Sequence, residues 1–153
     1  PIPDDLRDRL LAASTYDAGA TTVEFIASAL VDLDFHAGEA PSDAMAAQAE
    51  TLERIEMPAA ISMRHTTPHF AHVFSGDGYS SAYYSYMWSE VMDADAFEAF
   101  EEAGGPFDEA TAKKLEEHIL SVGGTKDPAE LYEAFRGRMP GVEALLRGRG
   151  LAA

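Results

Sequence analysis

The chain has 153 residues, 46% of them hydrophobic, which is enough to bury about two thirds of its unfolded surface in one domain over residues 1–153. Its 27 Asp and Glu residues against 11 Lys and Arg give a net charge of −16, which argues against nucleic acid and anionic membranes as partners. It has no cysteine, no signal-peptide pattern and no apolar run of about 18 residues, which argues against disulfides, thiolate zinc sites and membrane spans and favours a cytoplasmic location.

Helix signals recur along the chain, and no stretch alternates apolar and polar residues long enough to indicate a strand, so the predicted fold class is all-α. The sequence begins at Pro1 without methionine, which favours a processed chain or one cut from a longer protein. Pro3 and the two aspartates after it predict a helix that runs to about Ser14. Its buried stripe should consist of Leu6, Leu10 and Ala13.

A second helix is predicted over residues 21–36, where apolar residues occupy two faces. Only a narrow polar stripe of Glu24, Ser28 and Asp32 separates these faces, so most of this helix should be buried. A third helix, capped by Ser42, should end near Met57.

Residues 58–78 break the helical pattern with two prolines and two glycines, Pro58, Pro68, Gly76 and Gly78. We expect a long loop there, with at most short helical turns. Loops of this length inside compact domains are often functional.

The C-terminal half predicts four more helices. The first spans 80–102 with a break near Asp93, and the second spans 108–121 with three inward residues, Leu115, Ile119 and Val122. The motif Asp127-Pro128-Ala129-Glu130 is a strong start for the third, because it combines an N-cap, a first-turn proline and an acid at the third position. The fourth spans 140–147.

Three of the five histidines, His65, His69 and His72, lie within eight residues. Spacings of four and three would place them on one side of a helix, as metal ligands often are, but Pro68 disfavours helix there. The sequence also lacks H-E-x-x-H, the motif that supplies both zinc ligands and a general base. These features favour histidines that bond backbone or substrate, and no metal site in this chain.

Four of the six tyrosines lie between positions 79 and 86. A helix starting at Tyr79 would place Tyr79, Tyr83 and Tyr86 on one face and Tyr84 with Trp88 on another. Two interpretations remain open at this point. The rings could form an aromatic core, or their hydroxyls could bind substrate beside the preceding Gly-x-Gly loop, where backbone and substrate can approach closely.

The window from His69 to Phe97 resembles the C-terminal signature of thimet-oligopeptidase-like zinc metallopeptidases, in particular bacterial peptidyl-dipeptidases. It contains a histidine, a glycine-rich loop and the pattern G-Y-x-x-x-Y-Y-x-Y-x-W-S-E. The similarity extends over essentially the whole chain, from the helix at Pro3 to the Phe135-Arg136-Gly137-Arg138 stretch. It implies that this chain is part of a larger helical metallopeptidase fold.

The resemblance also implies roles for individual residues. Tyr86 would be the catalytic residue that stabilises the oxyanion, and His72 and Tyr79 would hold the substrate backbone, next to Gly76 and Gly78 of the glycine loop. One position departs from the pattern, since alanine stands at 82 where relatives commonly have glycine.

The family's zinc ligands and catalytic glutamate would lie upstream of residue 1. We therefore expect a C-terminal, substrate-binding segment that is inactive alone, with zinc as the cofactor of the full-length enzyme. Its partners would be the upstream zinc-binding portion and short peptide substrates, which either lose C-terminal dipeptides or are cleaved internally. The alternative is a stand-alone, non-catalytic helical peptide-binding module or an inactive remnant.

Overall fold

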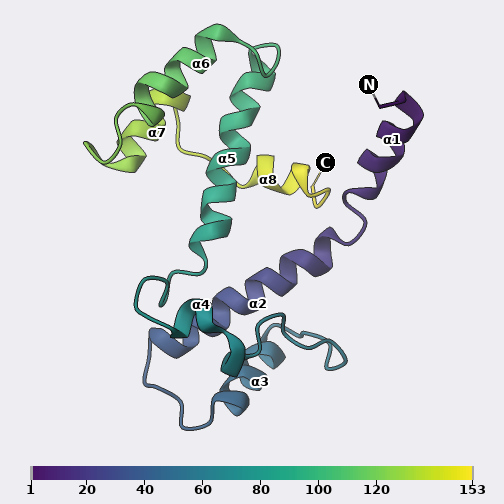
Figure 1. Cartoon of the computed structure of the whole chain (residues 1–153), viewed down its shortest axis with the longest axis vertical. Helices are drawn as coiled ribbons and strands as arrows, with labels where there is room; N and C mark the ends of the chain where they lie inside the picture. Colours follow the sequence, from purple (N-terminus) through teal and green to yellow (C-terminus); the bar gives the residue numbers. More distant parts are fainter. Residues whose placement is uncertain (1, 153) are drawn as a thin grey trace. The chain divides into compact units, whose positions relative to one another are not determined.

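The computed structural model describes residues 2–152, and helices, turns and loops without strands make up this part of the chain. The predicted all-α fold class is confirmed. The chain divides into two compact units, Pro1–Tyr86 and Met87–Ala153, and the boundary falls inside helix α5 (Figure 1). No helix within residues 2–152 is long and apolar enough to cross a membrane.

The first unit is built around the long helix α2. Figure 1 shows α3 and α4 beside the later part of α2, and α1 extending from its start. The elements in chain order are α1 (Asp4–Ala13), α2 (Ala18–His36), α3 (Ala44–Arg54), the 3₁₀-helix η1 (Thr67–His69), α4 (Ala71–Phe74) and the first residues of α5 (Ser85–Glu102).

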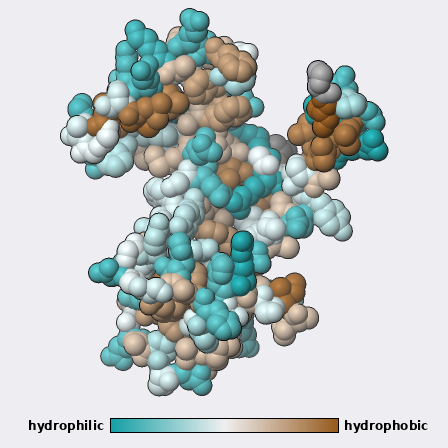
Figure 2. All heavy atoms as spheres, viewed as in Figure 1, coloured by the Kyte–Doolittle hydropathy of each residue, from teal (hydrophilic) through white to brown (hydrophobic). Residues whose placement is uncertain are grey.

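Helix α1 forms where the sequence predicts it, but its predicted buried stripe is wrong. Leu6 is 41% exposed and Leu10 is 56% exposed, and no residue of α1 is buried. Its apolar side is exposed, and Figure 2 shows hydrophobic side chains gathered there on the surface. Ion pairs one turn apart, Arg7 with Asp4 and Arg9 with Asp5, instead support the helix.

Helix α2 reverses the predicted arrangement of its polar stripe. Ser28 and Asp32 are 1% and 0% exposed, whereas Val23 and Ile26 on a predicted apolar face are 40% and 36% exposed. The reversal is possible because each buried oxygen has a partner, which offsets the cost of leaving water. Ser28 donates to the Glu24 carbonyl, and the Asp32 carboxylate accepts backbone hydrogen bonds from a distant loop.

The predicted loop over 58–78 supplies much of the core of the first unit. It contains two short helical elements, η1 and α4, as the sequence allows. The core cluster consists of Val31 from α2 together with Met63, Phe70 and Val73 from this segment. The loop is thus held by its own buried side chains.

Helix α3 is joined to its neighbours by polar contacts. The Gln48 side chain accepts hydrogen bonds from the backbone N–H and the hydroxyl of Thr67, at 2.7 and 2.9 Å. The N-cap is Asp43, whose carboxylate accepts from the amides of residues 45 and 46 at 3.0 Å, so the predicted Ser42 cap is wrong by one position.

The second unit contains the rest of α5, followed by α6 (Glu109–Leu115), the π-helix η2 (Glu116–Leu120), α7 (Pro128–Arg136) and α8 (Glu143–Gly148). Helix α5 runs through Asp93 without the predicted break. Asp127 caps α7 as predicted, accepting from the amide of Ala129 at 2.8 Å. The helix ends at Gly137, whose φ of +85° favours glycine.

A buried charge network stabilises the second unit. The Asp95 carboxylate, 1% exposed, accepts from the Tyr132 hydroxyl at 2.8 Å and from Arg136 Nε at 3.2 Å, and it pairs with Arg138 at 2.6 Å. Arg136 also makes a bidentate pair with Glu102. Burial alone would raise the pKa of Asp95, but the hydrogen bonds from Tyr132 and Arg138 and the charge of Arg136 hold it below its ordinary value.

Candidate functional site

The tyrosine-rich segment does not form the predicted helix, because α5 begins at Ser85 rather than near Tyr79. Residues 80–84 are turns that follow a bend at Tyr79, and Ser81 has a left-handed φ of +59°, which a right-handed helix excludes. The residue with the left-handed conformation is Ser81, which directly precedes Ala82, the position at which relatives commonly have glycine. The predicted shared helix face is wrong in its geometry.

Turns nevertheless bring the predicted side chains together. The His72 ring lies 4.3 Å from the Tyr79 ring and 5.7 Å from the Tyr86 ring, measured between centroids. Tyr79 and Tyr86 stack at 5.9 Å with only 9° between their planes, and the Tyr83 ring meets Tyr86 edge-on at 5.4 Å. We call these four residues the His72–tyrosine cluster.

A hydrogen bond joins the two ends of this cluster. His72 Nε2 and the Tyr86 hydroxyl lie 2.8 Å apart, and both residues are exposed, Tyr86 at 39%. A hydrogen-bonding interaction with Tyr79, and then partial burial, raise the pKa of Tyr86 above its ordinary value. The phenol therefore keeps its proton at neutral pH and is available as a hydrogen-bond donor.

Tyr83 differs from its two neighbours in that its ring is part of the core. It stacks on Phe25 at 5.2 Å and meets Phe70 edge-on at 5.0 Å. The two interpretations left open by the sequence thus apply to different residues. Tyr83 packs, while Tyr79 and Tyr86 present exposed rings beside His72.

Asp32 holds the backbone of this segment, a role that was not predicted from the sequence. Its carboxylate accepts from the backbone N–H of Ser81 and of Tyr83, each at 2.9 Å, and contacts His36 Nδ1 at 2.8 Å. The only available sequence signal was its place in a polar stripe on an otherwise apolar helix.

Comparison with known proteins places the chain in a family. A model of peptidase family M3 matches residues 1–151. The chain belongs to peptidase family M3. This agrees with the resemblance that the motif at residues 69–97 indicated.

Relatives in family M3 are similar over nearly the whole chain. Oligopeptidase A of Escherichia coli (strain K12) is 39% identical over 99% of the chain, and the probable cytosolic oligopeptidase A of Arabidopsis thaliana is 37% identical over 99%. Dipeptidyl carboxypeptidase of Escherichia coli (strain K12) is 34% identical over 98%. Each match covers 22% of the relative, so the chain spans about a fifth of the length of these peptidases.

The glycine loop that the family M3 motif highlights lies at the surface before the tyrosines. Gly76 and Gly78 are exposed, neither has a positive φ, and a Cβ at either position would meet no atom within 4 Å. Their conformation alone does not require glycine. The Gly76 carbonyl accepts from the Ser80 hydroxyl at 3.1 Å, which links the loop to the first turn of the tyrosine segment.

The three clustered histidines have separate environments. His65 stacks on Phe70 at 5.0 Å, and burial, with the adjacent charge of Arg64 next, lowers its pKa. His69 is exposed at the end of η1, His65 also meets the core ring of Tyr83 edge-on at 6.2 Å, and His72 is the histidine that lies against Tyr79 and Tyr86. Across residues 2–152 no three His, Asp or Glu side chains are arranged to hold a metal ion. The described residues of this M3 chain therefore do not fit a zinc site.

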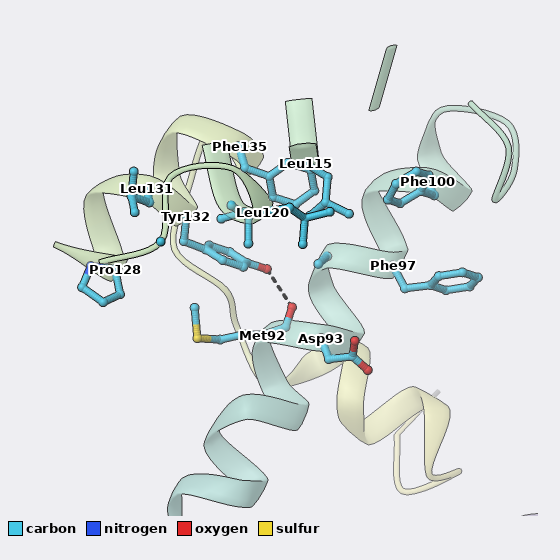
Figure 3. A pocket seen from close by; sticks show the side chains of 13 residues that line it. Met92, Asp93, Phe97, Phe100, Leu115, Leu120, Pro128, Leu131, Tyr132 and Phe135 are labelled. Atoms are coloured by element: carbon cyan, nitrogen blue, oxygen red, sulfur yellow. Dashed lines mark hydrogen bonds between the residues drawn. The ribbon is translucent and has the colours of Figure 1, made fainter. Parts of the chain in front are cut away.

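The second unit contains an apolar cavity of about 520 Å³. Figure 3 shows side chains from α5, η2 and α7 around it, with the Tyr132 hydroxyl near the Met92 carbonyl oxygen, 3.0 Å away. Phe100, Leu120 and Leu131 are among the lining residues. The lining has one carboxylate, that of Asp93, and no histidine, so it offers no acid–base pair.

Proposed function

We propose that the chain is the C-terminal, substrate-binding segment of a zinc-dependent peptidase that hydrolyses short peptides and releases C-terminal dipeptides. The observation that carries this proposal is the 2.8 Å contact between His72 Nε2 and the hydroxyl of Tyr86, next to the exposed ring of Tyr79. Family membership and the names of the relatives, oligopeptidase and dipeptidyl carboxypeptidase, support peptide hydrolysis. The second of these names supports dipeptide release.

The roles follow from the chemistry of the contact. With its proton on Nε2, His72 donates to the Tyr86 oxygen, so that the phenol proton can turn from Tyr79 to a substrate carbonyl. A phenol O–H aimed at a peptide carbonyl stabilises the negative charge that develops on that oxygen in the transition state. Tyr79, stacked on Tyr86, would hold the peptide backbone with His72, beside the loop of Gly76 and Gly78.

This chain's own contribution is to bind and orient the peptide. Zinc is proposed as the cofactor of the full-length enzyme, held by residues outside this chain, because the histidines described here do not form a site for it. The partners are the short peptide and that zinc-binding portion. A cytoplasmic location is proposed as well, in line with the name of the cytosolic relative from Arabidopsis thaliana.

The test is Tyr86→Phe in the full-length protein, with kcat and KM measured on a short peptide. We expect kcat to fall about a hundredfold with little change in KM, because the lost donor acts on charge present only in the transition state.

Tyr84→Phe is the matched control. Tyr84 is 47% exposed, whereas the described ring pairs with His72 are those of Tyr79, Tyr83 and Tyr86. Its hydroxyl should contribute at most about 1 kcal/mol to stability and little to rate. Equal effects of the two substitutions on kcat would refute the role of Tyr86. A change in KM alone would instead give Tyr86 a role in binding the peptide and none in stabilising the transition state.

A further inference from the structure

Asp32 is a completely buried carboxylate one turn before the end of α2. Its two oxygens have different partners. Oδ1 accepts from the Ser81 amide at 2.9 Å and contacts His36 Nδ1 at 2.8 Å, and Oδ2 accepts from the Tyr83 amide at 2.9 Å. Hydrogen bonds to an ionised acceptor are about twice as strong as neutral ones. A single side chain thus holds two backbone groups of the tyrosine segment.

The amides of Ser81 and Tyr83 lie in the part of the chain that sets the positions of the Tyr79 and Tyr86 rings. They flank residue 82, within the turns that separate Tyr79 from Tyr86. Ser81 has a φ of +59°, a conformation that costs free energy for any residue except glycine and persists only where its surroundings fix it. The Asp32 carboxylate supplies such a constraint at Ser81 itself.

The constraint at Tyr83 reaches the other rings by direct contact. On one side the Tyr83 ring packs on Phe70 in the core, and on the other it meets His72 at 5.7 Å and Tyr86 at 5.4 Å. A shift of the Tyr83 backbone would therefore move the surface against which His72 and Tyr86 rest.

We propose that Asp32 is a positioning residue, which fixes the rings of Tyr79 and Tyr86 beside His72 through the amides of Ser81 and Tyr83. This rests on the proposed function, since the consequence for catalysis requires that these rings bind and orient the peptide. Asp32 touches no substrate itself, because it is 0% exposed.

The experiment compares Asp32→Asn with Ser28→Ala in the full-length peptidase. Asparagine keeps the size of the side chain but replaces one carboxylate oxygen with an NH₂ group, which cannot accept. At least one of the present contacts, with the Ser81 amide, the Tyr83 amide or His36 Nδ1, is then lost. Ser28 is a matched control, because it is a buried polar residue one turn earlier whose hydroxyl donates to the carbonyl of Glu24 within its own helix.

Two readouts are needed, hydrogen exchange of the peptide covering residues 79–86 and the steady-state constants of the folded enzyme. For Asp32→Asn we expect faster exchange of the Ser81 and Tyr83 amides and a kcat lowered at least tenfold. In the double variant with Tyr86→Phe, kcat should fall little below that of the slower single variant, because both changes remove the same interaction. Ser28→Ala should leave both readouts near wild type.

A role in stability alone would give a different result. Asp32→Asn would then lower Tm, but its folded fraction would keep the kcat and exchange of Ser28→Ala, and this outcome overturns the proposal. Faster exchange with an unchanged kcat would overturn it as well. The proposed function fails separately, through an unchanged kcat in Tyr86→Phe.

Discussion

Asp95 is a buried carboxylate of the second unit with three partners, Tyr132, Arg136 and Arg138. Its pKa is lower in the folded chain than the value of about 3.9 in an unfolded one. The unfolded state therefore binds more protons in acid, and the stability that Asp95 contributes is fully present above about pH 4 and is lost as the pH falls through the folded pKa.

We predict that Asp95→Asn lowers the free energy of unfolding at pH 7 by about 2 kcal/mol, because buried donors of Tyr132 and Arg136 lose their charged acceptor. The difference from wild type should shrink as the pH falls below about 4. Urea unfolding followed by circular dichroism at several pH values measures it. Asp93→Asn, at an exposed position on the same helix, should show neither effect, and a loss at Asp95 that is independent of pH would contradict the argument.

How far single site residues could be predicted depends on where their partners lie in the sequence. His72, Tyr79 and Tyr86 lie within 15 positions and carry a motif, and the structure brings them together. Asp32 could not be predicted, because its partners Ser81 and Tyr83 lie 49 and 51 positions away. From the sequence alone, an aspartate on an apolar helix is expected to be exposed, because the backbone amides that it binds are not known.

At the level of helices, the start of α3 provides a sharp test of capping. Asp43 accepts from two amides at 3.0 Å, whereas Ser42, the predicted cap, lies one residue before it. We predict that Asp43→Ala lowers the free energy of unfolding by about 1 kcal/mol, the usual cost of losing an N-cap. Chemical unfolding of the variants measures this loss.

Ser42→Ala is the control, and it should change stability by less than about 0.5 kcal/mol, as surface substitutions usually do. If the serine substitution were the more costly of the two, the cap would be at Ser42 and the described geometry would be wrong. The sequence could not decide between adjacent Ser and Asp, because both residue types cap well and helix boundaries are rarely fixed to one residue.

The start of α5 shows how tertiary contacts override local helix signals. The sequence predicts a helix from Ser80, but Ser81 has a φ of +59°, which a right-handed helix excludes, and its amide and that of Tyr83 are held by Asp32. The helix then begins at Ser85, after these amides. For α1 the periodicity correctly predicts a helix with an apolar side, but periodicity cannot say whether another segment of the chain covers that side.

At the scale of the whole chain, most helices were predictable because caps, prolines and glycines mark them locally. What composition could not predict is the division into two units with separate stabilising centres, an aromatic and aliphatic core in one and a network around Asp95 in the other. Such centres depend on contacts between residues far apart in sequence. Arg136, for example, pairs with residues 34 and 41 positions away.

The last prediction concerns this 153-residue chain by itself. We expect the purified chain to be helical, to retain no stoichiometric zinc after dialysis, and to release no dipeptides from a short peptide. Tyr79 and Tyr86 can orient a carbonyl, but hydrolysis also needs an activated water. Among the described residues, His72 is the only His, Asp or Glu side chain in hydrogen-bond contact with these phenols.

Metal analysis and a peptide-release assay with and without added zinc or chelator provide the measurements, with the full-length protein as the positive control. One tight zinc per chain, lost on replacing His65 or His69, would contradict the separate environments of these histidines. Dipeptide release that a chelator does not inhibit would show instead that the chain carries a metal-independent mechanism in which His72 acts on water directly.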